Sequence, residues 1–232
     1  MKLFSKYLKS FIRATAIILI GINLFRLFDV LDYFNFLQPP LIALFNAIIL
    51  LFYSYLDELL ALFNIKMSYL FYMMLSLSIV TTFIGGLILG LYQLIPGYDS
   101  FAHFFNGGLL VFIGLFVISI FISGDKLNDL PFVFLIFIAF CFGQTIGVVW
   151  EIYEFAVDGL IGTNMQRFQE LNTHIDFIGR FALKDTMKDF ILNFLGGLIT
   201  SIIIYLDSKK DASYLELIFA QKINEYEKSY IS

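Results

Sequence analysis

The sequence predicts an all-α fold, a polytopic transmembrane helix bundle of about six spans within one integral membrane domain over residues 1–210. Of its 232 residues, 59% are hydrophobic and only 15% are charged, and the mean hydropathy is +0.84. Soluble domains do not combine these values. Several apolar stretches also approach the roughly 20 helical residues needed to cross a hydrocarbon core of about 30 Å. Composition and segment length therefore both indicate a membrane protein.

The apolar stretches are separated by turn-forming residues. They lie near 11–30, 40–57, 67–94, 101–122, 131–155 and 188–206. The first follows a basic segment, but no small-residue cleavage site comes after it, so we interpret it as a retained helix and not as a signal peptide. Pro39 and Pro40 fit a helix start, Pro96 and Gly97 fit a tight turn, and Pro131 fits a first helical turn.

The distribution of Lys and Arg predicts that both termini are cytoplasmic. With six spans and the N-terminus inside, ten of the fifteen basic residues fall in cytoplasmic segments, and the 31–39 and 95–100 loops contain none. The 156–187 connection is the exception, but it is long and also acidic, so it does not overturn the pattern. The remaining 211–232 segment is a cytoplasmic tail, and its pattern fits either an amphipathic helix on the membrane surface or a solvated tail.

Charge and cysteine content argue against nucleic-acid binding and against any site built from several cysteines. The chain has 15 basic and 19 acidic residues, with a net charge of -4 and no basic face with interleaved aromatic residues, so nucleic-acid binding is not expected. Cys141 is the single cysteine and lies in an apolar stretch. An intrachain disulfide and a cysteine metal cluster are therefore excluded.

Three groups of polar residues recur at helical spacing beside the predicted membrane boundary. They are Asp99 and His103, then Glu151 and Glu154, and then Asp185, Asp189 and Asn193. Spacings of three and four residues place the members of each group on one helix face. Under the predicted topology, the fourth helix begins, the fifth ends and the sixth begins on the same, outer side. We therefore expect the three groups to converge there.

Simpler interpretations account for some of these residues. Asp99 and Asp185 fit helix N-caps, whereas His103, Asp189 and Asn193 lie beyond a first helical turn. A polar side chain at that depth is costly when it faces lipid, so the last three need partners inside the bundle. The sequence leaves both interpretations open for Asp99 and Asp185.

Glu151 and Glu154 have an alternative of their own, as interfacial glutamates beside the belt residues Trp150 and Tyr153. If the three groups do meet, their carboxylates and one imidazole fit a divalent metal such as Mg, Mn, Fe or Zn. The predicted ligands are Asp99, His103, Glu151, Glu154, Asp185 and Asp189, and the predicted catalytic residues are Glu151, Glu154 and His103. A metal site of this kind activates water against a phosphate or acyl group, whereas a metal-free site relays protons.

Several short motifs of the chain resemble a known family. They are the segment from Tyr98 to His103 with Gly107-Gly108, the segments 150–155 and 162–166, and Asp185 to Asp189 with Asn193 and Gly196-Gly197. Over residues 85–206 the chain resembles the YjdF-like bacterial inner-membrane proteins and, more distantly, the VanZ-like proteins. The VanZ-like pattern has Glu-x-x-Gln where this chain has Glu151 and Glu154. The resemblance implies an inner-membrane location, an envelope-facing role and a polar site that includes Gln166 and Asn193, but it supplies no reaction.

Three classes of function remain open from the sequence. The first is a metal-dependent site acting on a lipid-linked or envelope substrate within a multi-pass protein of the inner cell membrane, surrounded by membrane lipids. The second is a non-catalytic binding or scaffold protein whose polar cluster sets the register of the helices. The third is a proton-coupled transporter, which requires the polar stripe to continue across the membrane.

Overall fold

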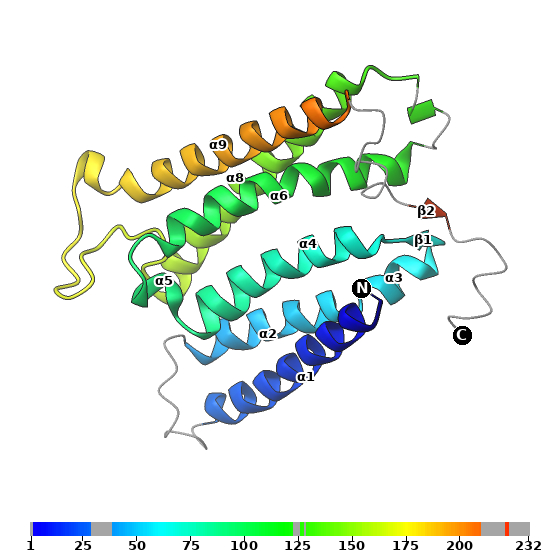
Figure 1. Cartoon of the computed structure of the whole chain (residues 1–232). Coiled ribbons are helices and arrows are strands. Elements are labelled where there is room, and N and C mark those ends of the chain that lie inside the picture. The colour runs from blue at the N-terminus through cyan, green and yellow to red at the C-terminus, as the bar shows by residue number, and fades with distance from the viewer. Residues whose placement is uncertain (1, 29–38, 123–125, 128, 210–220, 223–232) are drawn as a thin grey trace. The chain divides into compact units, whose positions relative to one another are not determined.

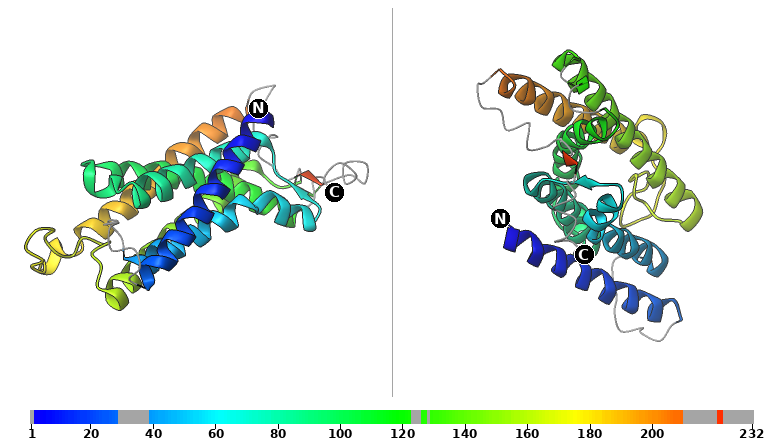
Figure 2. Two further views of the ribbon diagram at one scale, coloured as in Figure 1. Left: turned by 90° about the horizontal axis from the view of Figure 1, so that it is seen from below. Right: turned by 90° about the vertical axis from the view of Figure 1, so that its right-hand side faces the viewer.

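A computed structural model describes residues 2–28, 39–122, 126–127, 129–209 and 221–222 (Figure 1). The chain divides into two compact units, here called the N-terminal unit, residues 1–98 with 216–232, and the C-terminal unit, residues 99–215. Each unit is described separately below. Figure 2 gives two further views of the helices within each unit.

The N-terminal unit begins with two long helices, α1 (Lys2–Leu27) and α2 (Pro40–Ser54), which pack against each other. Pro39 is the N-cap of α2 and Pro40 occupies its first turn, as the sequence predicts. A short helix, α3 (Leu56–Leu62), follows α2 after a bend of 53°. The predicted 40–57 span is therefore a bent helix pair that ends at Leu62.

The second half of the N-terminal unit contains the strand β1 (Ile65–Lys66), α4 (Tyr69–Ile79), the π-helix η1 (Val80–Ile88) and α5 (Leu91–Leu94). The Ser68 hydroxyl caps α4 by accepting the Phe71 N–H at 3.1 Å. Gly90 has a left-handed backbone, with φ of 70°, and this conformation interrupts the helix. The predicted 67–94 span thus stops at Ile88, six residues early.

The C-terminal unit is built from three long helices, α6 (Tyr98–Phe121), α8 (Phe132–Ile161) and α9 (Lys184–Asp207). A 3-10 turn, η2 (Gly179–Phe181), precedes α9. The C-cap of α8 is Gly162, whose left-handed φ of 74° directs the chain out of the helix. Compared with the predicted 131–155 and 188–206 spans, α8 is six residues longer at its end and α9 begins four residues earlier.

Glycines allow the three helices of the C-terminal unit to approach closely. A Cβ added at Gly196 of α9 would overlap the carbonyl oxygen of Phe104 on α6, and one added at Gly107 would lie 2.7 Å from the Cα of Asn193. Between α6 and α8, a Cβ at Gly114 would lie 2.8 Å from the Cα of Ala139. Small residues are the usual means by which membrane helices achieve such contact.

Five helices of the described chain are long and apolar enough to cross a membrane, and the α2–α3 pair gives a sixth if it forms one span. The number, length and composition of these helices confirm the prediction of an all-α polytopic membrane bundle of about six spans. The cytoplasmic placement of the termini stays a prediction. Most of the 211–232 tail lies outside the described residues, and Gln221–Lys222 form the strand β2, which pairs antiparallel with β1.

Candidate functional site

The predicted polar groups lie at one end of the C-terminal unit, at the start of α6, the end of α8 and the start of α9. Helix α6 begins at Tyr98 and α9 at Lys184, so Asp99 and Asp185 lie in first helical turns and neither is an N-cap. The capping interpretation of these two residues is therefore wrong. Their charges still interact favourably with the positive ends of the two helix dipoles.

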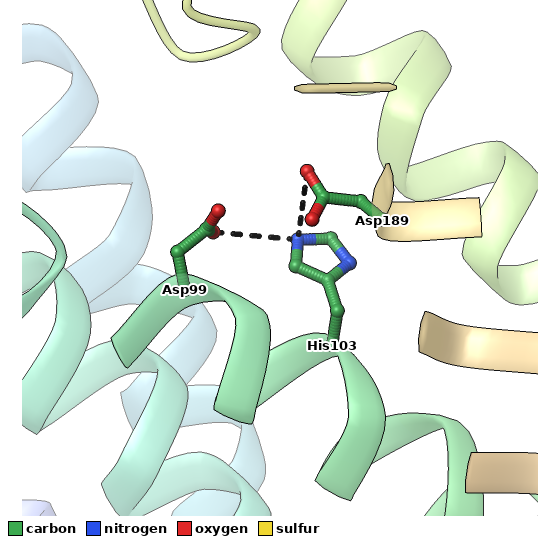
Figure 3. Close-up of side chains that lie close together, drawn as sticks. All are labelled: Asp99, His103 and Asp189. Atoms are coloured by element: carbon green, nitrogen blue, oxygen red, sulfur yellow. Dashed lines mark ion pairs between the residues drawn. The ribbon is translucent and has the colours of Figure 1, made fainter. Parts of the chain in front are cut away.

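Asp99, His103 and Asp189 come together in one cluster, here called the triad. One potential ligand atom from each lies within 4.8 Å of the other two. His103 Nε2 lies 3.5 Å from Asp99 Oδ1 and 3.9 Å from Asp189 Oδ2. Figure 3 shows the imidazole of α6 between the two carboxylates, one from its own helix and one from α9. Among the described residues, this is the only such group of His, Cys, Asp and Glu side chains.

Two cations contact the triad from its other side. Lys188 Nζ lies 2.9 Å from Asp185 Oδ1, 3.4 Å from Asp99 Oδ2 and 3.7 Å from Asp189 Oδ1. Arg167 reaches Asp99 at 3.7 Å and Asp185 at 3.8 Å. The carboxylates of Asp99 and Asp189 thus each present one oxygen to His103 and the other to Lys188. The side chains of Lys188 and Arg167 are 35% and 36% exposed, whereas that of Asp189 is only 2% exposed.

Glu151 and Glu154 are both buried near the end of α8. Trp150 Nε1 donates a hydrogen bond to Glu154 Oε1 at 2.8 Å, so this tryptophan is a partner of the acid and not only a belt residue. Both carboxylate oxygens of Glu151, and Oδ1 of Asp189, are buried without a hydrogen bond from any described residue. Burial makes a carboxylate charge costly, so these atoms favour a proton or a nearby cation, and for Asp189 Oδ1 that cation is Lys188 at 3.7 Å.

The predicted metal ligands therefore separate into two sets. Asp99, His103 and Asp189 form the triad, whereas Asp185 pairs with Lys188 and lies outside it, as do Glu151 and Glu154. Among the described residues, Lys188 and Arg167 pair with Asp99, Asp185 and Asp189, so the five carboxylates leave an excess of three negative charges when all are ionised. This excess favours binding of protons or a metal ion.

Asn193 lies one turn below Asp189 on α9 and is buried. Its amide donates to Gln144 Oε1 on α8 at 3.2 Å. Gly107 of α6 and Gly147 of α8 leave space for this residue, since a Cβ at either position would press on it. Asn193 therefore connects α8 and α9 directly beneath the triad, and the polar stripe extends inward at least to Gln144.

Asp158 organises the connection that follows α8. Its carboxylate accepts hydrogen bonds from the Thr163 hydroxyl at 2.6 Å and from the backbone N–H groups of Met165 and Gln166 at 2.7 and 2.9 Å. The Gln166 amide in turn donates to Thr186 Oγ1 in the first turn of α9, at 3.1 Å. Asp158 thereby holds Gln166, and Arg167 after it, over the site.

Replacing Asp158 with asparagine should release this connection. The substituted amide cannot accept all three hydrogen bonds, and an unsatisfied buried donor costs about 1–3 kcal/mol. We expect faster hydrogen exchange at the Met165 and Gln166 amides, measured by mass spectrometry. Thr163→Val removes one of the three donors and should give a smaller effect. Equal exchange in Asp158→Asn and the unmodified protein would contradict this role.

Sequence reasoning missed two contributions to the site. Pairing of Lys188 with the acids is a simple interpretation of the sequence and agrees with the structure. Arg167 belongs to the connection that is an exception to the charge pattern, yet it contacts the triad. Asp158, four residues after Glu154 on α8, binds backbone N–H groups of the connection rather than joining the carboxylate cluster. The available signal was a basic residue in a connection bounded by acidic helix ends, which indicates charge pairing across the connection.

No curated protein and no solved structure matches the chain. A family model described as "Predicted membrane protein (DUF2238)" matches residues 10–210, a range that includes α6, α8 and α9. The resemblance to YjdF-like proteins is consistent with this family, whereas the more distant similarity to VanZ-like proteins stays a prediction. The chain therefore belongs to the family of predicted membrane proteins DUF2238.

Proposed function

We propose that this protein binds one divalent metal ion through Asp99, His103 and Asp189. The observation that carries the proposal is the gathering of two carboxylates and one imidazole within 4.8 Å at the ends of two helices. Neighbouring ligands of one ion lie about 3 Å apart when metal–ligand bonds are about 2.1 Å. The distances from His103 Nε2 to Asp99 Oδ1 and Asp189 Oδ2 are 3.5 and 3.9 Å, so each needs to shorten by less than about 1 Å when an ion binds.

The burial of Asp189 supports the proposal further. Its side chain is only 2% exposed, its Oδ1 makes no hydrogen bond with any described residue, and the Lys188 ammonium lies 3.7 Å from that oxygen. A carboxylate in this position has a strong preference for a positive charge. Neutral histidine and carboxylate oxygen are ligands suited to Mn, Fe and Zn.

A metal ion held by Asp99, His103 and Asp189 would supply Lewis-acid chemistry toward water or toward a phosphate or acyl group, and Glu151 would be the group that takes up the proton. Glu151 is buried at the end of α8, the helix end that lies beside the starts of α6 and α9, and its carboxyl group would serve as this proton carrier. The substrate would be lipid-linked or envelope-derived, and the protein would act in the inner cell membrane. The position of the site at the ends of apolar helices supports a substrate presented at the membrane surface.

Metal analysis of the purified protein tests this function. Protein in detergent should contain about one Mn, Fe or Zn per chain by mass spectrometry, and Asp189→Asn should weaken binding by at least about 100-fold. That magnitude follows because outer partners of metal ligands alone contribute roughly 10- to 100-fold. Asp176→Asn, a carboxylate outside the cluster, should retain the metal.

If the protein is a non-catalytic scaffold whose polar cluster only sets the register of the helices, the same metal analysis gives a different result. The unmodified protein would then hold no metal, titration with Mn²⁺ or Zn²⁺ would show no saturable binding, and Asp189→Asn would change only stability. That outcome would overturn the metal proposal and leave the polar cluster as a device for helix register.

A further inference from the structure

The connection between α8 and α9 carries large apolar side chains that no part of the C-terminal unit covers. They are Leu171, Ile175, Phe177, Ile178, Phe181 and Leu183. Ile178 is 87% exposed and Phe181 is 70% exposed, and Leu160 at the end of α8 is 85% exposed. Isolated exposed apolar residues are ordinary, but six large ones within thirteen residues of one connection indicate an interaction surface.

This apolar segment has a defined backbone fold. Residues 168–177 form a hairpin, in which the Glu170 N–H donates to Ile175 O at 3.0 Å and the Phe177 N–H donates to Phe168 O at 2.8 Å. The Thr173 side chain and backbone donate to the Glu170 carboxylate at the hairpin tip, which lowers the pKa of Glu170. The hairpin therefore satisfies many of its own polar groups while presenting its apolar side chains outward.

The chain itself indicates what covers these side chains. The connection is tethered at both ends by helices that are long and apolar enough to span a membrane, α8 up to Ile161 and α9 from Lys184. Figure 1 shows it in yellow beyond the ends of those two helices, and Figure 2 shows the same arrangement from below. A segment held there lies at the membrane surface, where lipid is the nearest apolar phase.

The basic residues of the segment fit the same location. Arg180 lies between Ile178 and Phe181, and Lys184 follows Leu183, and both basic side chains are exposed. Long cationic side chains extend from an apolar surface toward lipid headgroups and attract anionic lipids. Aromatic, aliphatic and basic residues in this mixture are typical of segments that lie in the membrane interface.

We propose that residues 177–183 insert into the headgroup–acyl boundary of the leaflet at the site's end of the bundle. Ile178 and Phe181 enter the acyl region, and Arg180 and Lys184 remain among the headgroups. The hairpin tip near Asn172 stays in water. Gln166 and Arg167 belong to the same connection, so its insertion places the triad at the depth of the lipid headgroups. An amphiphilic ligand in the membrane then approaches the triad from within the lipid layer. The insertion does not depend on whether a metal binds the triad.

Spin-label depth measurements test the insertion in liposomes that contain an anionic phospholipid. In a Cys141→Ala background, nitroxides are attached at Ile178→Cys, Phe181→Cys and, as a matched control in the same connection, Asn172→Cys. Oxygen concentrates in the acyl region and a water-soluble nickel chelate does not. We expect the ratio of oxygen to nickel accessibility to be at least about threefold higher at positions 178 and 181 than at 172, as for interfacial segments.

Two outcomes would overturn the proposal. Equal nickel accessibility at all three positions would place the segment in water, and low accessibility to both reagents at 178 and 181 would show that protein covers it. The unmodified chain provides a second measurement, because a lipid-soluble carbene probe should label the tryptic peptide 168–180. Absence of that label would also overturn the proposal, whatever the metal content of the protein.

Discussion

Replacing Gly196 with alanine is expected to destabilise the protein by about 3 kcal/mol or more. The added Cβ would overlap the carbonyl oxygen of Phe104, a backbone atom that cannot rotate away. Relief of this overlap requires α6 and α9 to separate, and these helices carry the three triad residues. We therefore expect a lower unfolding temperature, measured by circular dichroism in detergent, and weaker metal binding in the same variant.

Gly159→Ala is the matched control for this substitution. Gly159 lies in α8, and a Cβ there would have no atom within 4 Å. Alanine stabilises an unobstructed helix position by roughly 0.5–1 kcal/mol relative to glycine, so this variant should be unchanged or slightly more stable. Equal unfolding temperatures for Gly196→Ala and Gly159→Ala would show that the α6–α9 contact is not tight.

Replacing Lys188 with glutamine is expected to tighten divalent metal binding by about tenfold or more. The ammonium lies 3.4 Å from Asp99 and 3.7 Å from Asp189, so it competes electrostatically with any ion bound by the same carboxylates. Unit charges at such distances interact by several kcal/mol at an effective dielectric of about 20, and tenfold in affinity corresponds to about 1.4 kcal/mol. Isothermal titration with Mn²⁺ or Zn²⁺ measures the change.

The same variant should lose stability when metal is absent. Without the ammonium, Asp99, Asp185 and Asp189 repel one another, so the metal-free protein should unfold at a lower temperature than the unmodified protein. Added metal should reverse this loss, because a ligand that binds only the folded state stabilises it. Lys184→Gln, at an exposed position one turn earlier, should change neither quantity. Weaker metal binding in Lys188→Gln would instead make Lys188 a supporting residue of the site.

The proposed metal site and the segment proposed to insert into the membrane belong to the same end of the C-terminal unit. The acids lie deepest, with Asp189 only 2% exposed, and the two cations lie nearer the surface. The apolar residues of 177–183 then border the site on the chain that already carries Arg167. A ligand with a polar headgroup and an apolar tail fits this order of chemical environments.

Several structural features follow directly from local sequence. The apolar stretches become helices because helical hydrogen bonding satisfies the backbone inside a membrane, and Pro39, Pro40 and Pro131 lie at helix starts. The spacing of Asp99 and His103 places them on one helix face, since a turn contains 3.6 residues. Of the two interpretations left open for Asp99 and Asp185, helix capping does not hold, because the helices already begin at Tyr98 and Lys184, one residue before each aspartate.

Other features depend on contacts between distant segments. Local spacing shows that Asp189 lies beyond the first turn of its helix, but only the α6–α9 packing at Gly196 and Gly107 brings it to His103. The same packing leaves Glu151, Glu154 and Asp185 outside the triad. Arg167 joins it because Asp158 folds the intervening connection back over the helix ends, whereas Lys188 is carried by α9 itself.

The sequence by itself determined the membrane class, the apolar helices and the set of polar residues from which a site is built. It did so because hydrophobicity and helical periodicity are properties of residues close together in the chain. Only the tertiary structure decided which of those residues meet, since distances between side chains on different helices depend on backbone approach and on the path of the connection. The Asp99, His103 and Asp189 triad is the result of that packing.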